Sequence, residues 1–477
     1  MTQISSSELS SSAHAALGGV ADVLMPGDDG YAGSAASLFA DGTPDLVVRP
    51  RDADGVAAAL RYAADAGLAV TVRSGGHSMA GLSTSADGMI IDTRRLSAVR
   101  VLDWASGRVR VGAGATWGAV AAALSPHGLG LTAGDTSQVG VGGLTLGGGI
   151  GWMVRRHGLA IDSLAAARLV TADGRLVGAD AVEHADLFWA LRGGGGNFGV
   201  AVSFDFTAQP VTSVHFGAIS YQAGDLARFI AGWRDLMRAS DEKLTTTLNL
   251  MPAVPGRPGS VTLMCCYASP DGAEAAEALR PFRALAPVAS DGVRAMPYAE
   301  VLEDMAPLPA GLRMEVRNAF FSTLDDGCVA AADELFAGGG AALTLRSMGG
   351  AAARVGRDAT AFAHRDAEVL VAAAFLLPQA APPGLLDQAL NRWSSVAVLG
   401  TGAYVGFLGS AGPADVAAAY PPDTYRRLAE VKRRYDPANV FRRTHNILPD
   451  QPRGGTPTMP APASRGTASD SESRTTR

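Results

Sequence analysis

The 477-residue sequence lacks the features that mark several large classes of protein. Its three cysteines, Cys265, Cys266 and Cys328, are too few for a disulfide framework and lack the spacing of a zinc site, so we expect buried free thiols. No run of about 18 uncharged apolar residues occurs, and no basic segment precedes an apolar run at the N-terminus. These absences predict a cytoplasmic protein with no membrane association and no metal site.

Nucleic acid is not an expected partner either. The net charge is −6, and the 40 Lys and Arg residues are scattered rather than clustered. The sequences G-x-x-x-x-G-K-[ST], H-E-x-x-H and G-x-S-x-G are all missing. A P-loop nucleotide hydrolase, a zinc protease and an α/β-hydrolase are therefore not supported.

The order of apolar patterns indicates two different domains. PDLVVRP, DADGVAAALRYAADAG and LAVTVRSGG read as strand, helix and strand, which is an α/β opening. After about residue 211, strand patterns such as VTLMCCYAS alternate with Ala-rich helical stretches. We predict a lead-in over 1–40, a first domain over 41–210, a second over 211–400, a closing segment over 401–450 and a disordered tail over 451–477.

Glycine is abundant, with 58 residues, and it gathers in four clusters. The clusters are RSGGHS (73–78), VGAGATW (111–117), QVGVGGLTLGGGIG (138–151) and ALRGGGGNFG (190–199). Glycine runs let backbone N–H groups converge on a phosphate, although they also make tight turns. The match to G-x-G-x-x-G at Gly194, Gly196 and Gly199 precedes a strand pattern rather than a helix, so we do not predict a Rossmann nicotinamide site.

Four ordered segments resemble the vanillyl-alcohol-oxidase superfamily of flavoproteins, and within it the berberine-bridge-enzyme-like oxidases. They are RSGGHS, QVGVGGLTLGGGIGWMVRRHGLAID, LFWALRGGGGNFGV and YDPANVFRRTHNI, and the resemblance covers roughly 44–210 and 404–449. It implies an α+β fold with a two-subdomain, PCMH-type FAD-binding domain over 41–210. It also implies a separate substrate domain, an antiparallel sheet covered by helices, and a segment over 401–450 that returns to the FAD domain.

The resemblance implies FAD as cofactor, covalently bonded through a ring nitrogen of His77 to the flavin 8α-methyl. Many relatives add a second bond from a cysteine, but the matching residue is Thr136, so a single bond and a less oxidising flavin are expected. Val139 matches a position where valine permits oxygen access, which favours an oxidase. The other residues expected to bind the cofactor are Arg73, Ser74, Gly75, Gly76, Ser78, Gly142, Gly143, Gly147, Gly149, Val200 and Asn446.

The catalytic base is the weakest part of the resemblance. His157, in RRHGL, replaces a family tyrosine and could titrate near neutrality, or it could simply cap a helix. Tyr404, in GAYVGF, resembles a family strand near the substrate and could orient or deprotonate a hydroxyl, although Gly406 replaces the usual asparagine. Val371 and Ala373 stand where cyclising relatives carry a glutamate, and these apolar residues fit either a substrate pocket or a domain core.

Together these features predict an FAD-dependent oxidase. It would take a hydride from an alcohol, hemiacetal or amine carbon of a small organic substrate, a secondary metabolite or sugar-like compound, with molecular oxygen reoxidising the flavin to give hydrogen peroxide. A dehydrogenase with another electron acceptor and a flavin-binding protein with little turnover remain as alternatives. The sequence assigns no oligomeric state.

Overall fold

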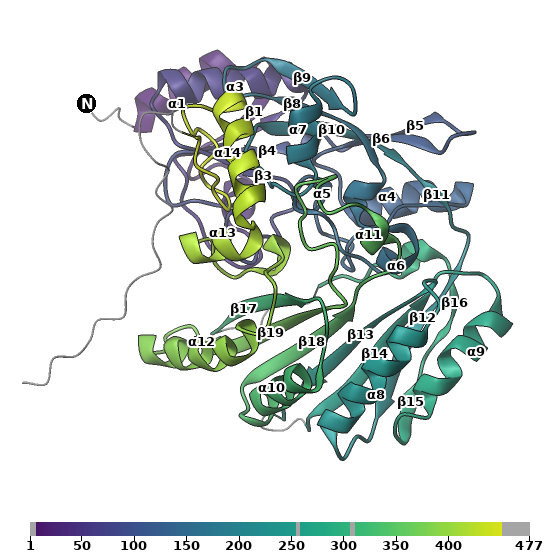
Figure 1. The fold of residues 1–477 in the computed structure, drawn as a ribbon. Helices are drawn as coiled ribbons and strands as arrows, with labels where there is room; N and C mark the ends of the chain where they lie inside the picture. Colours follow the sequence, from purple (N-terminus) through teal and green to yellow (C-terminus); the bar gives the residue numbers. More distant parts are fainter. Residues whose placement is uncertain (1–5, 254–257, 306–310, 451–477) are drawn as a thin grey trace, which may run out of the picture.

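The computed structural model describes residues 6–253, 258–305 and 311–450 (Figure 1). The tail predicted over 451–477 lies outside the described residues. The helices of this part of the chain are α1 (Ser6–Leu17), α2 (Tyr31–Ala35), α3 (Ala53–Asp65), α4 (Trp117–Leu124), α5 (Val141–Gly147), α6 (Val154–His157), α7 (Ala185–Leu191), α8 (Leu226–Ala239), α9 (Gly272–Arg283), α10 (Asp326–Ala337), α11 (Ala351–Arg354), α12 (Pro383–Ala397), α13 (Pro413–Ala419) and α14 (Pro422–Tyr435). The strands are β1 (Ala21–Leu24), β2 (Leu46–Pro50), β3 (Val70–Arg73), β4 (Met89–Asp92), β5 (Val99–Asp103), β6 (Arg108–Gly112), β7 (Leu129–Gly130), β8 (Leu164–Val170), β9 (Leu176–Asp180), β10 (Val200–Thr207), β11 (Gln209–Pro210), β12 (Val214–Tyr221), β13 (Leu244–Met251), β14 (Ser260–Tyr267), β15 (Val288–Asp291), β16 (Arg294–Met296), β17 (Leu312–Phe321), β18 (Ala341–Ser347) and β19 (Val369–Pro378).

The first sheet has the order β1-β2-β4-β3, and the α/β opening predicted for it is confirmed. Strands β2, β4 and β3 run parallel, and α3 between β2 and β3 begins where the Asp52 carboxylate accepts the Gly55 N–H. Residues before the predicted first domain also contribute to this sheet. Strand β1 pairs antiparallel with β2, and α1 packs on α3.

The second sheet has the order β5-β6-β10-β8-β9, and all its pairings are antiparallel. Its central strand β10 follows the glycine cluster at 193–199 directly. That cluster therefore opens a strand, which agrees with the absence of a Rossmann site.

The third sheet holds strands β12 to β19 in the order β15-β12-β14-β13-β18-β19-β17, with β16 beside β12, and every pair is antiparallel. Figure 1 shows α8, α9, α10 and α12 on its outer side. Because side chains alternate along a strand, one face packs under these helices and the other faces the first two sheets. Val371 and Ala373 belong to the helix-covered core, so the core interpretation of these residues is confirmed.

The segment after α12 returns to the first two sheets, where α14 packs on α7 (Figure 1). Lys432 of α14 is fully buried, and its Nζ donates to the Asn197 and Phe441 carbonyls and to the Asp436 carboxylate at 2.7–3.0 Å. These bonds join the glycine cluster at 193–199 to the chain after α14.

Within the described residues, no helix has the length and apolar character needed to cross a membrane, and no group of three or more His, Cys, Asp or Glu residues is arranged to hold a metal ion. The three cysteines are free and buried, as expected.

Candidate active site

A cavity of about 690 Å³ is lined by residues of both the N-terminal sheets and the third sheet. We call the lining residues of 74–79, 134–152 and 195–201 the glycine wall. The sheet wall comprises Phe216, Thr247, Asn249, Met264, Met314, Val316, Thr344, Arg346, Ala372 and Ala374. Residues 404–407 and 441–445 of the returning segment complete the lining.

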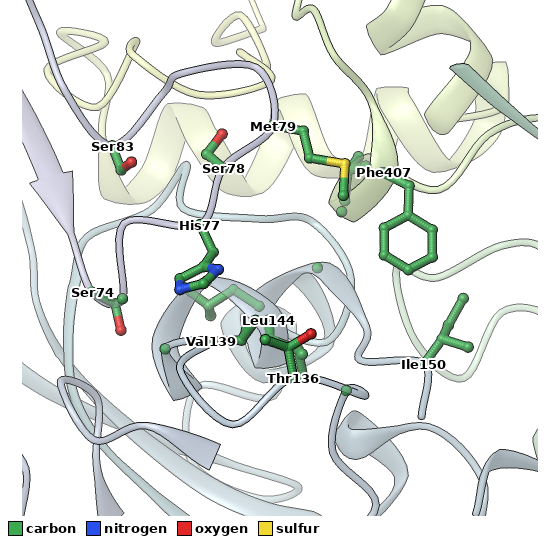
Figure 2. A pocket seen from close by; sticks show the side chains of 18 of the residues that line it. Ser74, His77, Ser78, Met79, Ser83, Thr136, Val139, Leu144, Ile150 and Phe407 are labelled. Atoms are coloured by element: carbon green, nitrogen blue, oxygen red, sulfur yellow. The ribbon is translucent and has the colours of Figure 1, made fainter. Parts of the chain in front are cut away.

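His77 projects from a tight turn into this cavity (Figure 2). The turn follows β3, is held by a 2.7 Å hydrogen bond from Ser74 Oγ to the Ala113 carbonyl, and contains Gly76 at φ +77°. Burial, together with the nearby Arg73 cation, lowers the pKa of His77, so its imidazole is neutral at neutral pH. Its Nδ1 is buried with no hydrogen-bond partner among the described residues.

The glycine wall is shaped by backbone. At Gly75 an added Cβ would collide with the backbone of Gly140, so the turn and the loop before α5 touch directly. At Gly143 and Gly196, by contrast, a Cβ would meet nothing within 4 Å, and both residues line the cavity. A bare backbone facing open space beside an unpartnered histidine fits a large ligand such as FAD, whose phosphates and ring would contact main-chain groups.

Thr136 and Val139 lie on the loop opposite His77 (Figure 2). The loop is fixed to the segment 301–305, because Ser137 N–H donates to the Glu303 carbonyl at 3.0 Å and Ser137 Oγ bonds the Asp304 carboxylate. The lining residues Glu303 and Asp304 are exposed and place acidic groups at the rim of the cavity.

Tyr404 is held by both neighbouring regions of the molecule. The Asn318 side chain, on β17, accepts the Tyr404 N–H at 2.7 Å and donates to the Tyr404 carbonyl at 3.0 Å. The phenol oxygen accepts the Gly149 N–H at 3.1 Å. Burial raises the pKa of Tyr404 to about 12, so the phenol stays protonated and can donate a hydrogen bond into the cavity.

Arg346 reaches from the sheet wall to the glycine wall. Its guanidinium pairs with Asp135, donates to the Ile150 carbonyl at 3.4 Å, and lies 5.5 Å from the Trp152 ring centroid. Only 4% of Arg346 is exposed, so this is a buried cation compensated by a carboxylate and by aromatic faces. The pair ties the start of the loop that carries Thr136 and Val139 to β18.

Most of the predicted cofactor residues line this one cavity. They are Ser74, Gly75, Gly76, His77, Ser78, Thr136, Val139, Gly142, Gly143 and Gly147, and the lining also includes Tyr404. Gly149, Val200 and Asn446 do not line it, although their chain neighbours Ile150, Gly199, Ala201 and His445 do. Val200 is a core residue, and the amide oxygen of Asn446 is buried without a partner.

Arg73 supports the turn from behind instead of facing the cavity. Its Nη1 donates to the Ser34 carbonyl at 2.9 Å and to the Ala36 carbonyl, and its guanidinium packs under Gly76. In this position the Arg73 guanidinium does not reach the cavity, so it makes no direct contact with a pyrophosphate bound there.

His157 lies outside the central cavity and does not fit the role of catalytic base. It ends the short helix α6 and borders a separate surface hollow with Arg156, Ser240, Asp241 and Glu242. Burial, with the Arg156 cation, lowers the pKa of His157 to about 4, well below the range suited to a base at neutral pH.

The sequence interpretation missed the residues of the sheet wall. Their signal was present as partial alternation in LTTTLNLM: Leu244, Leu248 and Leu250 share one face of the strand, whereas Thr247 and Asn249 lie on the other face and are polar. Such a strand has one core face and one face turned toward something else. The acidic rim and the Arg346–Asp135 pair have no comparable local signal, because each joins segments far apart in the chain.

The fold and the cavity define an FAD-binding oxidoreductase. The FAD binding domain family matches residues 44–180, and the berberine and berberine-like family matches 403–448. The chain is 31% identical to (R)-6-hydroxynicotine oxidase of Paenarthrobacter nicotinovorans over 457 residues, covering 90% of this chain and 97% of that protein. It therefore belongs to the berberine-bridge-enzyme-like family of FAD-linked oxidoreductases, an enzyme family that includes oxidases.

Solved structures share the whole architecture. The crystal structure of 6-hydroxy-D-nicotine oxidase from Arthrobacter nicotinovorans superposes with a TM-score of 0.81 at 27% identity, covering 90% of this chain and 98% of that one. A structure of glucooligosaccharide oxidase from Acremonium strictum, described with a 6-S-cysteinyl, 8α-N1-histidyl FAD, superposes with a TM-score of 0.77 at 21% identity, covering 91% and 98%. The α+β fold with helix-covered antiparallel sheet is confirmed.

Proposed function

We propose that the chain carries FAD on a single covalent bond to His77 and oxidises a small organic substrate. The observation that carries the proposal is the neutral His77 imidazole, which lines the cavity and has a buried nitrogen without a partner. A neutral imidazole has the free electron pair that a bond to carbon requires. Thr136 replaces the cysteine of doubly linked relatives, and its hydroxyl offers no second tether of that kind.

FAD supplies a hydride acceptor for the substrate C–H bond. Tyr404, protonated and fixed by Gly149 and Asn318, donates a hydrogen bond that orients the substrate oxygen or nitrogen. Its high pKa makes it an orienting donor and a poor base. Ile150, Trp152 and Phe407 give this part of the cavity an apolar lining against which the substrate carbon would lie.

Molecular oxygen is the proposed electron acceptor, so each turnover moves two hydrogens from the substrate to oxygen and yields hydrogen peroxide. The support is Val139, whose short side chain lines the cavity beside Thr136 and leaves room there (Figure 2), together with the oxidase relative named above. A dehydrogenase that passes electrons to a quinone or protein is the second candidate, and it predicts substrate-dependent dye reduction without oxygen uptake.

The first test is acid precipitation of the purified yellow protein, followed by absorbance and peptide mass measurements. We expect flavin to remain on the peptide that contains His77 in the wild type and in the control variant His127→Ala, whose exposed histidine lies outside the cavity. The variant His77→Ala should release all its flavin. Release of flavin from the wild type would overturn the covalent link.

The second test screens the holoenzyme against alcohols, amines and sugars in an oxygen electrode. Oxygen uptake of which half is returned by catalase identifies an oxidase. Reduction of the bound flavin without oxygen uptake identifies the dehydrogenase, and a flavin that none of the compounds reduces identifies a flavin-binding protein with little turnover.

A further inference from the structure

The cavity face of the third sheet carries one compact polar block. On β13, Leu244, Leu248 and Leu250 pack under the helices, whereas Thr247 and Asn249 line the cavity. On the adjacent strand β18, Leu343 and Leu345 pack under the helices, whereas Thr344 and Arg346 line the cavity. Thr247 stands opposite Arg346 and Asn249 opposite Thr344 in the β13–β18 register, so the four side chains form a contiguous group. Figure 1 shows β13 beside β18.

Apolar side chains flank this block on both sides. Met264 of β14 stands opposite Thr247, and Ala372 of β19 stands opposite Thr344. The rest of the sheet wall consists of Phe216, Met314, Val316 and Ala374. Thioether and methyl groups pack well against flat rings and offer no strong hydrogen bonds. A sugar, which carries hydroxyl groups all around its ring, would leave most of them unpaired against this wall.

Within the block, Thr247 Oγ1 and Arg346 Nε are buried without a partner among the described residues, and Asn249 has spare hydrogen-bonding capacity on a side chain that is only half-buried. Thr344 Oγ1 donates to Asn249 Oδ1 at 3.2 Å, which fixes the amide plane and directs its NH2 group elsewhere. The Asn249 amide nitrogen has no partner among the described residues, and Asn249 is only half-buried on the cavity face. Arg346, by contrast, is already paired with Asp135 and Ile150. The half-buried free group of the block, the Asn249 amide nitrogen, is therefore a donor, and it calls for an acceptor on the ligand.

We infer that Asn249, oriented by Thr344, is a specificity-determining residue that selects an aromatic substrate of one or two rings bearing a hydrogen-bond acceptor such as a ring carbonyl or phenolic oxygen. The ring body lies against Met264, Met314 and the alanines of β19, and the acceptor meets the Asn249 amide. This inference rests on the proposed function, because it concerns the substrate of the same cavity.

The test measures binding of two matched probes to the holoenzyme by calorimetry and by perturbation of the flavin absorption band. Acetophenone has an aromatic ring and a carbonyl acceptor, and α-methylstyrene has the same shape without the acceptor. We expect Asn249→Leu to weaken acetophenone binding about fivefold, the value of one hydrogen bond of ~1 kcal/mol, and to leave α-methylstyrene binding unchanged. Thr344→Val, which removes only the orienting bond, should weaken acetophenone binding by a smaller factor and guards against misfolding of the first variant.

Thr262→Val is the matched control. Thr262 pairs with Asn249 across β13 and β14, so it lies on the same face of the sheet, but it is outside the cavity lining and its hydroxyl lies 3.4 Å from that of Ser220. This variant should bind both probes as the wild type does.

Equal acetophenone affinity in wild type, Asn249→Leu and Thr344→Val would overturn the role of Asn249. Lactose binding that is lost in Asn249→Leu would overturn the aromatic substrate class. Neither result affects the proposed function, which fails separately if flavin is missing from the His77 peptide, and the calorimetric comparison is valid with or without the flavin.

Discussion

The two walls of the cavity present different groups to a ligand, backbone in the glycine wall and side chains in the sheet wall. In the glycine wall the backbone itself faces the ligand, and at Gly75 and Gly140 two backbone segments touch with no room for a side chain. In the sheet wall the strands hold the backbone away and present alternating side chains such as Asn249 and Met264. A substitution in the glycine wall changes the course of the backbone around the cavity, whereas a substitution in the sheet wall changes which molecule the cavity can bind. Four predictions test this contrast.

The largest effect is expected for Gly75→Ala in the glycine wall. The new Cβ would collide with the Gly140 backbone, which is not the end of a flexible side chain and cannot move aside. We expect a loss of about 3 kcal/mol in unfolding free energy and no retained flavin, measured by denaturant titration and absorbance. Gly178→Ala on β9, where a Cβ meets nothing within 4 Å, is the control and should keep both properties. A yellow, stable Gly75→Ala protein would contradict the account of this wall.

Asn318→Leu tests the contact through which β17 of the third sheet holds Tyr404 beside the glycine wall. The substitution leaves the buried Tyr404 N–H and carbonyl without their side-chain partners, which should cost about 3 kcal/mol in unfolding free energy. Chemical denaturation of the holoenzyme measures it, and the exposed Asn391→Leu on α12 serves as control. An effect no larger than that of the control would show that Tyr404 is placed by other contacts.

Tyr404→Phe tests side-chain chemistry with the backbone unchanged. Loss of one hydrogen-bond donor should lower kcat/KM about tenfold while covalent flavin is retained. Because the pKa of Tyr404 is raised to about 12, the phenol is protonated throughout the range from neutrality to pH 10, and activity should show no limb from its ionisation there. A limb near pH 10 that disappears in Tyr404→Phe would mean that the tyrosine acts as a base. Tyr435→Phe, outside the cavity, is the control.

The smallest effect is expected for His157→Gln, since this residue belongs to neither wall. Activity near pH 8 should stay within about twofold of the wild type. The pKa of His157 is lowered to about 4 in the fold from an ordinary 6.5, so the stability it contributes is present above pH 6.5 and is lost as the pH falls toward 4. The variant should therefore lose less stability than the wild type over that range, whereas the exposed His14→Gln should behave as the wild type. A large loss of activity would restore His157 as a catalytic residue.

The contrast between the walls also explains what could be predicted from the sequence. The turn at Ser74–Ser78 and the loop before α5 are each a short, glycine-rich stretch of consecutive residues. Local sequence and family resemblance therefore predicted that both would line one cavity. The strand–helix–strand opening was predicted for the same reason, since its periodicity is local.

The sheet wall depends on register, which is not local. The family resemblance singled out Val371 and Ala373 of β19, which belong to the helix-covered core. The residues of that strand that line the cavity are Ala372 and Ala374, each one position later in the chain. A shift of one residue turns a side chain to the opposite face of the sheet, so the strand pattern alone left both the pocket and the core open for Val371 and Ala373. The two alternatives for His157 stayed open for a related reason: a motif gives a residue its neighbours in the chain, but the direction of a four-residue helix such as α6 is set by tertiary contacts.

The residues that line the cavity are synthesised at different times. Residues 74–79 are made first, the strands of the third sheet follow, and Tyr404 and His445 are made after all of them. Because Tyr404 and His445 belong to the lining, the cavity is complete only once the returning segment, which Lys432 joins to Asn197, has packed on the first two sheets.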